Sequence, residues 1–109
     1  MKRGKVESYL GFAAKARKIS TGYNTCLFMM EKRKIKLLIL AEDLSENSRE
    51  KMTAAADKQG VPYRIYGKIE DLSHMTGTEG KGIFGLADDN FAKVILSEID
   101  RQSLEEEVF

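Results

Sequence analysis

The sequence has few of the residues that staple a fold covalently or through a metal. Its 109 residues include one Cys, one His, one Pro and no Trp. The single Cys26 forbids an internal disulfide and a cysteine-rich zinc site, so a reducing, cytoplasmic location is expected. No apolar run approaches the roughly 18 residues of a transmembrane helix, and a secretory core is lacking at the N-terminus. We therefore expect one globular domain over residues 1–109, without a membrane, metal or cofactor.

Charge is divided unevenly along the chain, although the net charge is only +1. Residues 1–40 carry ten Lys/Arg and two Asp/Glu, whereas residues 41–109 carry eight and fifteen. A basic segment favours contact with a polyanion such as nucleic acid, and an acidic segment disfavours such contact elsewhere. The alternative is that both segments are solvated faces of an ordinary domain.

The apolar residues alternate between strand and helix spacing. Strands are expected over Ile19–Ser20, Ile35–Ala41, Val61–Tyr66 and Ile83–Ala87, with helices between and around them. The second of these runs is nearly all apolar, which suits a strand buried on both faces with a parallel neighbour. The pattern predicts an α/β fold: a three-layer α-β-α sandwich with a small mixed, mostly parallel four-stranded sheet. A frayed acidic tail is expected over about 103–109.

Helix ends can also be assigned from the sequence. Ser45 or Asn47 suits the N-cap of the third helix, and Gly60 suits its C-terminal end. The last helix is expected to start at Asp88 or Asp89 and to bury Phe91, Val94, Ile95 and Ile99.

Two motifs point only weakly to catalysis or nucleotide binding. Gly80–Gly85 matches G-x-G-x-x-G, but it enters a strand instead of opening a helix, as phosphate binding requires. We expect these glycines to form a turn with Lys81 at its tip. Cys26 lies among apolar residues and is expected to be a buried, inert thiol.

Two acidic residues raise the hypothesis of a small enzyme. Glu42 and Asp43 follow a buried strand, where catalytic acids often lie, but we expect them to cap the next helix. No nucleophile-elbow sequence surrounds a serine, and His74 has no partner that the sequence identifies. The sequence therefore predicts no catalytic residue, no metal ligand and no small-molecule substrate.

The strongest candidate site is Ser20–Thr25, which joins a short strand, a glycine turn and a helix start. The unpaired N–H groups of a first helical turn bind anionic oxygen, and Asn24 carries the donor and acceptor needed to read a base edge. The alternative is an ordinary helix start with Tyr23 packed on the surface. The residues alone leave both interpretations open.

The string Lys18–Asp43 resembles the kink-turn RNA-binding ribosomal-protein family, its small bacterial members above all, and the likeness covers nearly the whole chain. Members typically read Gly-x-Asn-Glu-x-x-Lys at the second helix, and use it on sheared G·A pairs and phosphates of a kinked RNA. Gly22 and Asn24 match this pattern. Thr25 stands where Glu is common, and Phe28 stands where Lys is common.

The resemblance implies a non-catalytic, cytoplasmic protein that binds kink-turn or ribosomal RNA, associates with the ribosome, needs no cofactor and is a monomer when free. It also implies that Gly67–Glu70 and Thr78–Gly82 together cradle an extruded base. The second hypothesis is a protein–protein interaction module on the same fold, with RNA binding weakened or lost. The predicted RNA-binding residues are Lys18, Ser20, Thr21, Gly22, Tyr23, Asn24, Thr25, Lys32, Arg33, Lys36, Ile69 and Lys81.

Overall fold

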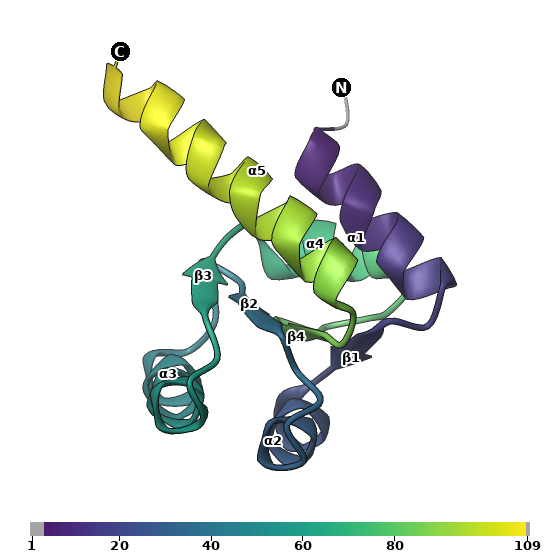
Figure 1. The fold of residues 1–109 in the computed structure, drawn as a ribbon, viewed down its shortest axis with the longest axis vertical. Coiled ribbons are helices and arrows are strands. Elements are labelled where there is room, and N and C mark those ends of the chain that lie inside the picture. Colours follow the sequence, from purple (N-terminus) through teal and green to yellow (C-terminus); the bar gives the residue numbers. More distant parts are fainter. Residues whose placement is uncertain (1–3, 109) are drawn as a thin grey trace.

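The computed structural model describes residues 4–108, with side chains as far as residue 104. Helices α1, α4 and α5 cover one face of a four-stranded sheet, and α2 and α3 cover the other (Figure 1), which confirms the three-layer sandwich. The helices are α1 (Lys5–Lys15), α2 (Tyr23–Glu31), α3 (Glu46–Gln59), α4 (Ile69–Thr76) and α5 (Asp89–Val108). The strands are β1 (Ile19–Thr21), β2 (Leu37–Leu40), β3 (Tyr63–Ile65) and β4 (Ile83–Leu86).

The sheet has the order β1-β4-β2-β3. It is mixed and four-stranded as predicted, but the prediction that it is mostly parallel is wrong. Only β2 and β3 pair in parallel, and β4 pairs antiparallel with both β1 and β2. β1, β2 and β3 run the same way, and the reversed strand lies between two of them. The apolar pattern of β4 shows that both its faces are buried, but burial does not encode direction.

The sheet has two different ends along the strand direction, a carboxyl end and an amino end, named for β1, β2 and β3. At the carboxyl end, β1 and β2 finish on either side of the start of β4. There the Gly22 N–H donates to the Ile83 carbonyl at 2.9 Å, and the Ala41 N–H donates to the Gly82 carbonyl at 2.9 Å. These two bonds bring the start of α2, the end of β2 and the loop before β4 to one place.

At the amino end, β1 and β2 begin on either side of the last residues of β4. The Ala87 N–H donates to the Lys18 carbonyl at 2.8 Å, and the Lys36 N–H donates to the Leu86 carbonyl at 2.7 Å. Since neighbouring strands lie about 4.8 Å apart, the backbones of Lys18 and Lys36 are roughly 10 Å apart across β4.

Helix caps follow the sequence closely, with some corrections. Ser45 caps α3 by accepting from the Ser48 N–H at 3.2 Å, and Gly60 ends that helix in the left-handed region.

Of the residues expected to be buried in α5, Val94 is 41% exposed, because the buried stripe runs through Ala92, Ile95 and Ile99 and leaves Val94 on another face. The tail expected to fray over 103–109 continues α5 as far as Val108, and Phe109 lies outside the described residues.

Two helices end on arginines in the left-handed region. Arg17 follows α1 and Arg33 follows α2, each with a φ of 59°. Each arginine N–H donates to the carbonyl three residues earlier, and the next lysine N–H donates five residues back, which is a Schellman cap. α3 and α4 instead end on left-handed glycines, Gly60 and Gly77. A β-carbon in this conformation costs roughly 1–2 kcal/mol that glycine avoids.

We expect Arg17→Gly to be more stable than Arg17→Ala by about 1 kcal/mol, and the same for the two substitutions at Arg33. Both replacements remove the charge, but only alanine keeps the strained β-carbon. Urea denaturation followed by circular dichroism measures the difference. Equal stabilities of the glycine and alanine variants would show that the left-handed conformation is relaxed in solution.

Candidate nucleic-acid interface

The start of α2 exposes backbone donors. Gly22 is the N-cap, with φ 94° and ψ 160°, and no side chain caps the helix. The first helical bond runs from the Cys26 N–H to the Gly22 carbonyl at 3.1 Å. The N–H groups of Tyr23, Asn24 and Thr25 therefore have no acceptor within the helix, and they lie at the positive end of its dipole.

The residues predicted around this turn differ in their exposure to solvent. Asn24 and Thr25 are exposed, as an RNA contact requires. Gly22 is predicted to bind RNA, but its N–H is bonded to the Ile83 carbonyl of the sheet, so this N–H is not available to a base. Tyr23 is half-buried and packs against the core between α2 and α3. Ser20 and Thr21, in β1, are also half-buried.

Lys81 lies beside this turn. Its Nζ is 3.6 Å from the position that a β-carbon on Gly22 would occupy. Ser73 of α4 holds the Lys81 backbone on both sides, because its Oγ donates to the Lys81 carbonyl at 2.9 Å and accepts from the Lys81 N–H at 2.8 Å. Sequence analysis missed Ser73, since nothing in the sequence links a buried serine to a backbone eight residues away.

Ile69 completes the assembly. Its Cγ1 lies 3.0 Å from the position of a β-carbon on Gly82, so α4 begins against the loop that carries Lys81. We call the exposed start of α2, Lys81 and Ile69 the candidate interface. The fold thus brings together residues that are about 60 positions apart in the sequence.

Two carboxylates lie near the start of α4, and both have partners there. Asp43 Oδ1 accepts from the Ile69 N–H at 2.9 Å, and a Glu42 oxygen lies 4.0 Å from Lys68 Nζ. The expectation that these acids cap the helix after β2 is wrong, because Asp43 caps α4 and Ser45 caps α3. Lys81, not a carboxylate, is the charged side chain over Gly22, which favours an anion there.

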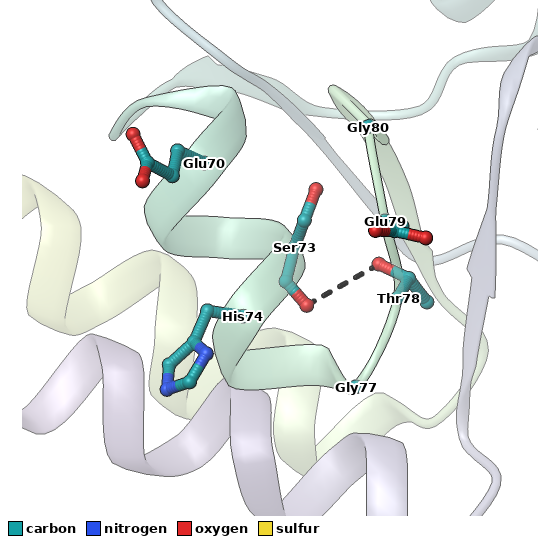
Figure 2. A pocket seen from close by; sticks show the side chains of 7 residues that line it. All are labelled: Glu70, Ser73, His74, Gly77, Thr78, Glu79 and Gly80. Atoms are coloured by element: carbon teal, nitrogen blue, oxygen red, sulfur yellow. Dashed lines mark hydrogen bonds between the residues drawn. The ribbon is translucent and has the colours of Figure 1, made fainter.

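An open hollow of about 490 Å³ is lined by residues of α4 and of the loop that joins α4 to β4 (Figure 2). Glu70 and Glu79 stand on its two sides, and His74 points away from Thr78. The Thr78 hydroxyl donates to the Ser73 carbonyl at 3.4 Å, which ties the loop to α4. Two carboxylates disfavour a phosphate in this hollow, so anions are expected on the Lys81 side of the loop.

The remaining predicted cations are not brought together with Asn24. Lys18 and Lys36 lie at the amino end of the sheet, and Lys32 and Arg33 lie at the C-terminal end of α2. β4 and its flanking residues separate the two ends by roughly 17 Å. Lys32 Nζ lies 5.4 Å from the centre of the exposed Phe28 ring, midway along α2.

Cys26 is buried as predicted, and its thiol points to the Ser20 carbonyl at 3.4 Å. Burial raises the pKa of this thiol to about 12, partly offset by a backbone hydrogen bond from Gly85.

Among the described residues, no group of three or more His, Cys, Asp or Glu side chains is placed to hold a metal ion. None of the helices in the described part of the chain is long and apolar enough to cross a membrane.

The model of the ribosomal protein L7Ae/L30e/S12e/Gadd45 family matches residues 4–95. The chain belongs to this family. The RNA-binding protein YlxQ of Bacillus subtilis (strain 168) is 30% identical over 91 residues, which cover 84% of this chain and 91% of that protein. The RNA-binding protein YlxQ of Enterococcus faecium is 30% identical over 92 residues, 84% of this chain and 87% of the relative. The predicted resemblance to small bacterial members is confirmed.

Two solved structures have the same fold as this chain. A protein of unknown function from Bacillus halodurans C superposes with a TM-score of 0.87 at 24% identity, over 90% of this chain and 99% of that one. The Giardia lamblia 15.5kD RNA binding protein superposes with a TM-score of 0.74 at 17% identity, over 93% and 90% of the two chains.

We expect Gly22→Ala to destabilise the protein by about 1–3 kcal/mol, because its φ lies in a region that is almost closed to other residues. The added β-carbon itself would lie at an ordinary contact distance, 3.6 Å, from Lys81 Nζ, so the expected loss comes from the backbone conformation. Urea denaturation measures the loss. Gly11→Ala is the control, since Gly11 lies within α1 at ordinary contact distance from its neighbour. A Gly22→Ala variant as stable as this control would contradict the observed turn.

We expect Cys26 to react with a thiol reagent about 1,000-fold more slowly in the folded protein than in urea at pH 8. A pKa of about 12 against an ordinary 9.0 lowers the thiolate fraction by that factor. Absorbance of the released thiol reports the rate. Rapid labelling of the folded protein would reopen the hypothesis of a nucleophilic cysteine.

Proposed function

We propose that this protein is a non-catalytic RNA-binding protein that recognises a kink-turn or a similarly kinked ribosomal RNA through the carboxyl end of its sheet. The observation that carries the proposal is the exposed Asn24 at an uncapped helix start, with the Lys81 ammonium over the adjacent Gly22. Family membership and the RNA-binding names of the YlxQ relatives support RNA as the partner. Cytoplasmic location, ribosome association and a monomeric free state belong to the same proposal.

Each part of the candidate interface has a distinct role in this proposal. Asn24 pairs with a base edge, since its amide both donates and accepts. The free N–H groups of the first turn and Lys81 bind phosphate oxygens. Ile69 packs on a base that leaves the stack at the kink. A straight duplex offers neither the splayed base nor this placement of phosphates, so recognition depends on RNA shape.

Two residues of α2 alter the usual chemistry. Thr25 can hydrogen-bond but brings no charge, and Phe28 removes a phosphate partner one helical turn later. Lys32, whose ammonium lies over the Phe28 ring, is the nearest following cation on the same helix face. We therefore propose a lower affinity than a glutamate and a lysine at these positions would provide.

Titration of a kink-turn RNA and a straight duplex of equal length at moderate salt tests the function. We expect tighter binding of the kink-turn, and Asn24→Ala should weaken that binding by about 1–3 kcal/mol. Asn90→Ala is the matched control, because Asn90 is an exposed asparagine at the second position of α5. Equal affinity of the wild type for both RNAs would refute recognition of shape.

The exposure of Phe28 favours a second candidate function, a protein–protein interaction module on the same fold. Its side chain is 56% exposed, although an aromatic ring of this size is ordinarily buried. A partner retained after nuclease treatment and lost with Phe28→Ala would support this function. A partner released by nuclease would count against it.

A further inference from the structure

The amino end of the sheet gathers most of the basic residues of the first forty. Two short segments supply them, 15–18 at the end of α1 and 32–36 at the end of α2. All seven cations are exposed, and none takes part in the three ion pairs that the described residues form. They are Lys15, Arg17, Lys18, Lys32, Arg33, Lys34 and Lys36.

Strand pairing explains why the two segments meet. Lys18 and Lys36 are the residues just before β1 and β2, and both are hydrogen-bonded to the end of β4 from opposite sides. α1 lies on one face of the sheet and α2 on the other (Figure 1). Their C-terminal ends therefore extend the row of cations onto both faces. The negative ends of the two helix dipoles also suit cations here. Lys15 in the last turn of α1 and Lys32 at the C-cap of α2 supply this interaction without a left-handed arginine.

The two helix caps indicate that charge, not local geometry, selects these residues. Both helices place Arg and then Lys at the last two positions of a Schellman cap, as Arg17-Lys18 and Arg33-Lys34. The first of these positions ordinarily holds glycine, as at Gly60 and Gly77 in this chain. The second position is commonly apolar. Strained residues that keep a charge where a neutral residue would fit better indicate a functional contact.

We propose that the amino end of the sheet is a second RNA contact, which binds the phosphate backbone of a duplex. Unpaired cations spread over two faces suit an extended polyanion better than a single phosphate group. Since this end lies roughly 17 Å from the candidate interface, no single nucleotide reaches both. The duplex is either a flanking arm of the kinked RNA or a separate helix, and the protein thereby joins two RNA segments.

The choice of RNA as the polyanion rests on the proposed function, so the experiment measures the two ends separately. The full-length chain is titrated with a kink-turn RNA with short arms, with the same RNA lengthened by one helical turn, and with a separate labelled duplex added to the short complex. Arg17→Gly/Arg33→Gly removes two charges and relieves two strained turns, so this variant folds. Lys5→Gln/Lys51→Gln removes two exposed charges elsewhere and is the matched control.

We expect the wild type either to bind the longer RNA more tightly or to capture the added duplex, which identifies the duplex as an arm or as a separate helix. In the double glycine variant, the affinity gained from the longer RNA or the added duplex should be about tenfold smaller than in the wild type. The steepness of log K against log salt should decrease by roughly 1.8, which is 0.9 for each lost phosphate contact. The control should change the gain by less than about twofold.

Three results would overturn the proposal. These are no gain from either duplex, an equal gain in the double glycine variant, and an equal loss in the control. Polyglutamate is titrated as a probe for an acidic protein partner. If the wild type binds polyglutamate but not duplex, and the double glycine variant binds polyglutamate more weakly, the surface would be assigned to an acidic protein instead. Failure of the proposed function is a separate outcome, because Asn24→Ala would then leave the short kink-turn RNA unaffected while the amino end still bound duplex.

Discussion

The insertion of β4 between β1 and β2 is the constraint on which the rest of the molecule depends. Ile83, the first residue of this strand, accepts a hydrogen bond from the Gly22 N–H, and Gly82 just before it accepts from the Ala41 N–H. The last residues of the strand pair with the starts of β1 and β2. One strand therefore determines where α2 starts, where the loop bearing Lys81 lies and which cations meet at the opposite end. Because β4 is buried on both faces, its position is held by packing against both core clusters.

Residues with a positive φ occur at both ends of the sheet, Gly22 at the carboxyl end and Arg17 and Arg33 at the amino end. At the carboxyl end, the positive φ of Gly22 lets the chain turn into α2 beside the Lys81 side chain, in a conformation that residues with a β-carbon rarely adopt. At the amino end, two arginines also have a positive φ, in the left-handed region, where glycine would be more stable. The first arrangement brings the Lys81 ammonium beside the uncapped start of α2. The second keeps charge on the surface at a cost in stability of roughly 1–2 kcal/mol for each residue.

The chemistry of the two ends is complementary. The carboxyl end offers directional groups: free backbone N–H groups, the Asn24 amide and the apolar side chain of Ile69. The amino end offers charge without a defined geometry, and it holds most of the basic residues of the first forty. Directional groups recognise shape and base edges, whereas flexible cations supply affinity that depends on salt. α2 connects the two ends.

The sequence by itself determined the order of the elements, most caps, the buried apolar runs and the family, because these depend on local spacing and short motifs. Asn24, Gly22 and Lys81 could be selected as candidates for the same reason. Only the tertiary structure decided that β4 is antiparallel and central, that the Gly22 N–H is used in the sheet, that Asp43 caps α4 and that Lys18 and Lys36 lie far from Asn24. Each of these facts is set by pairing between segments distant in sequence, and apolar periodicity records that a strand is buried without recording its neighbours or direction.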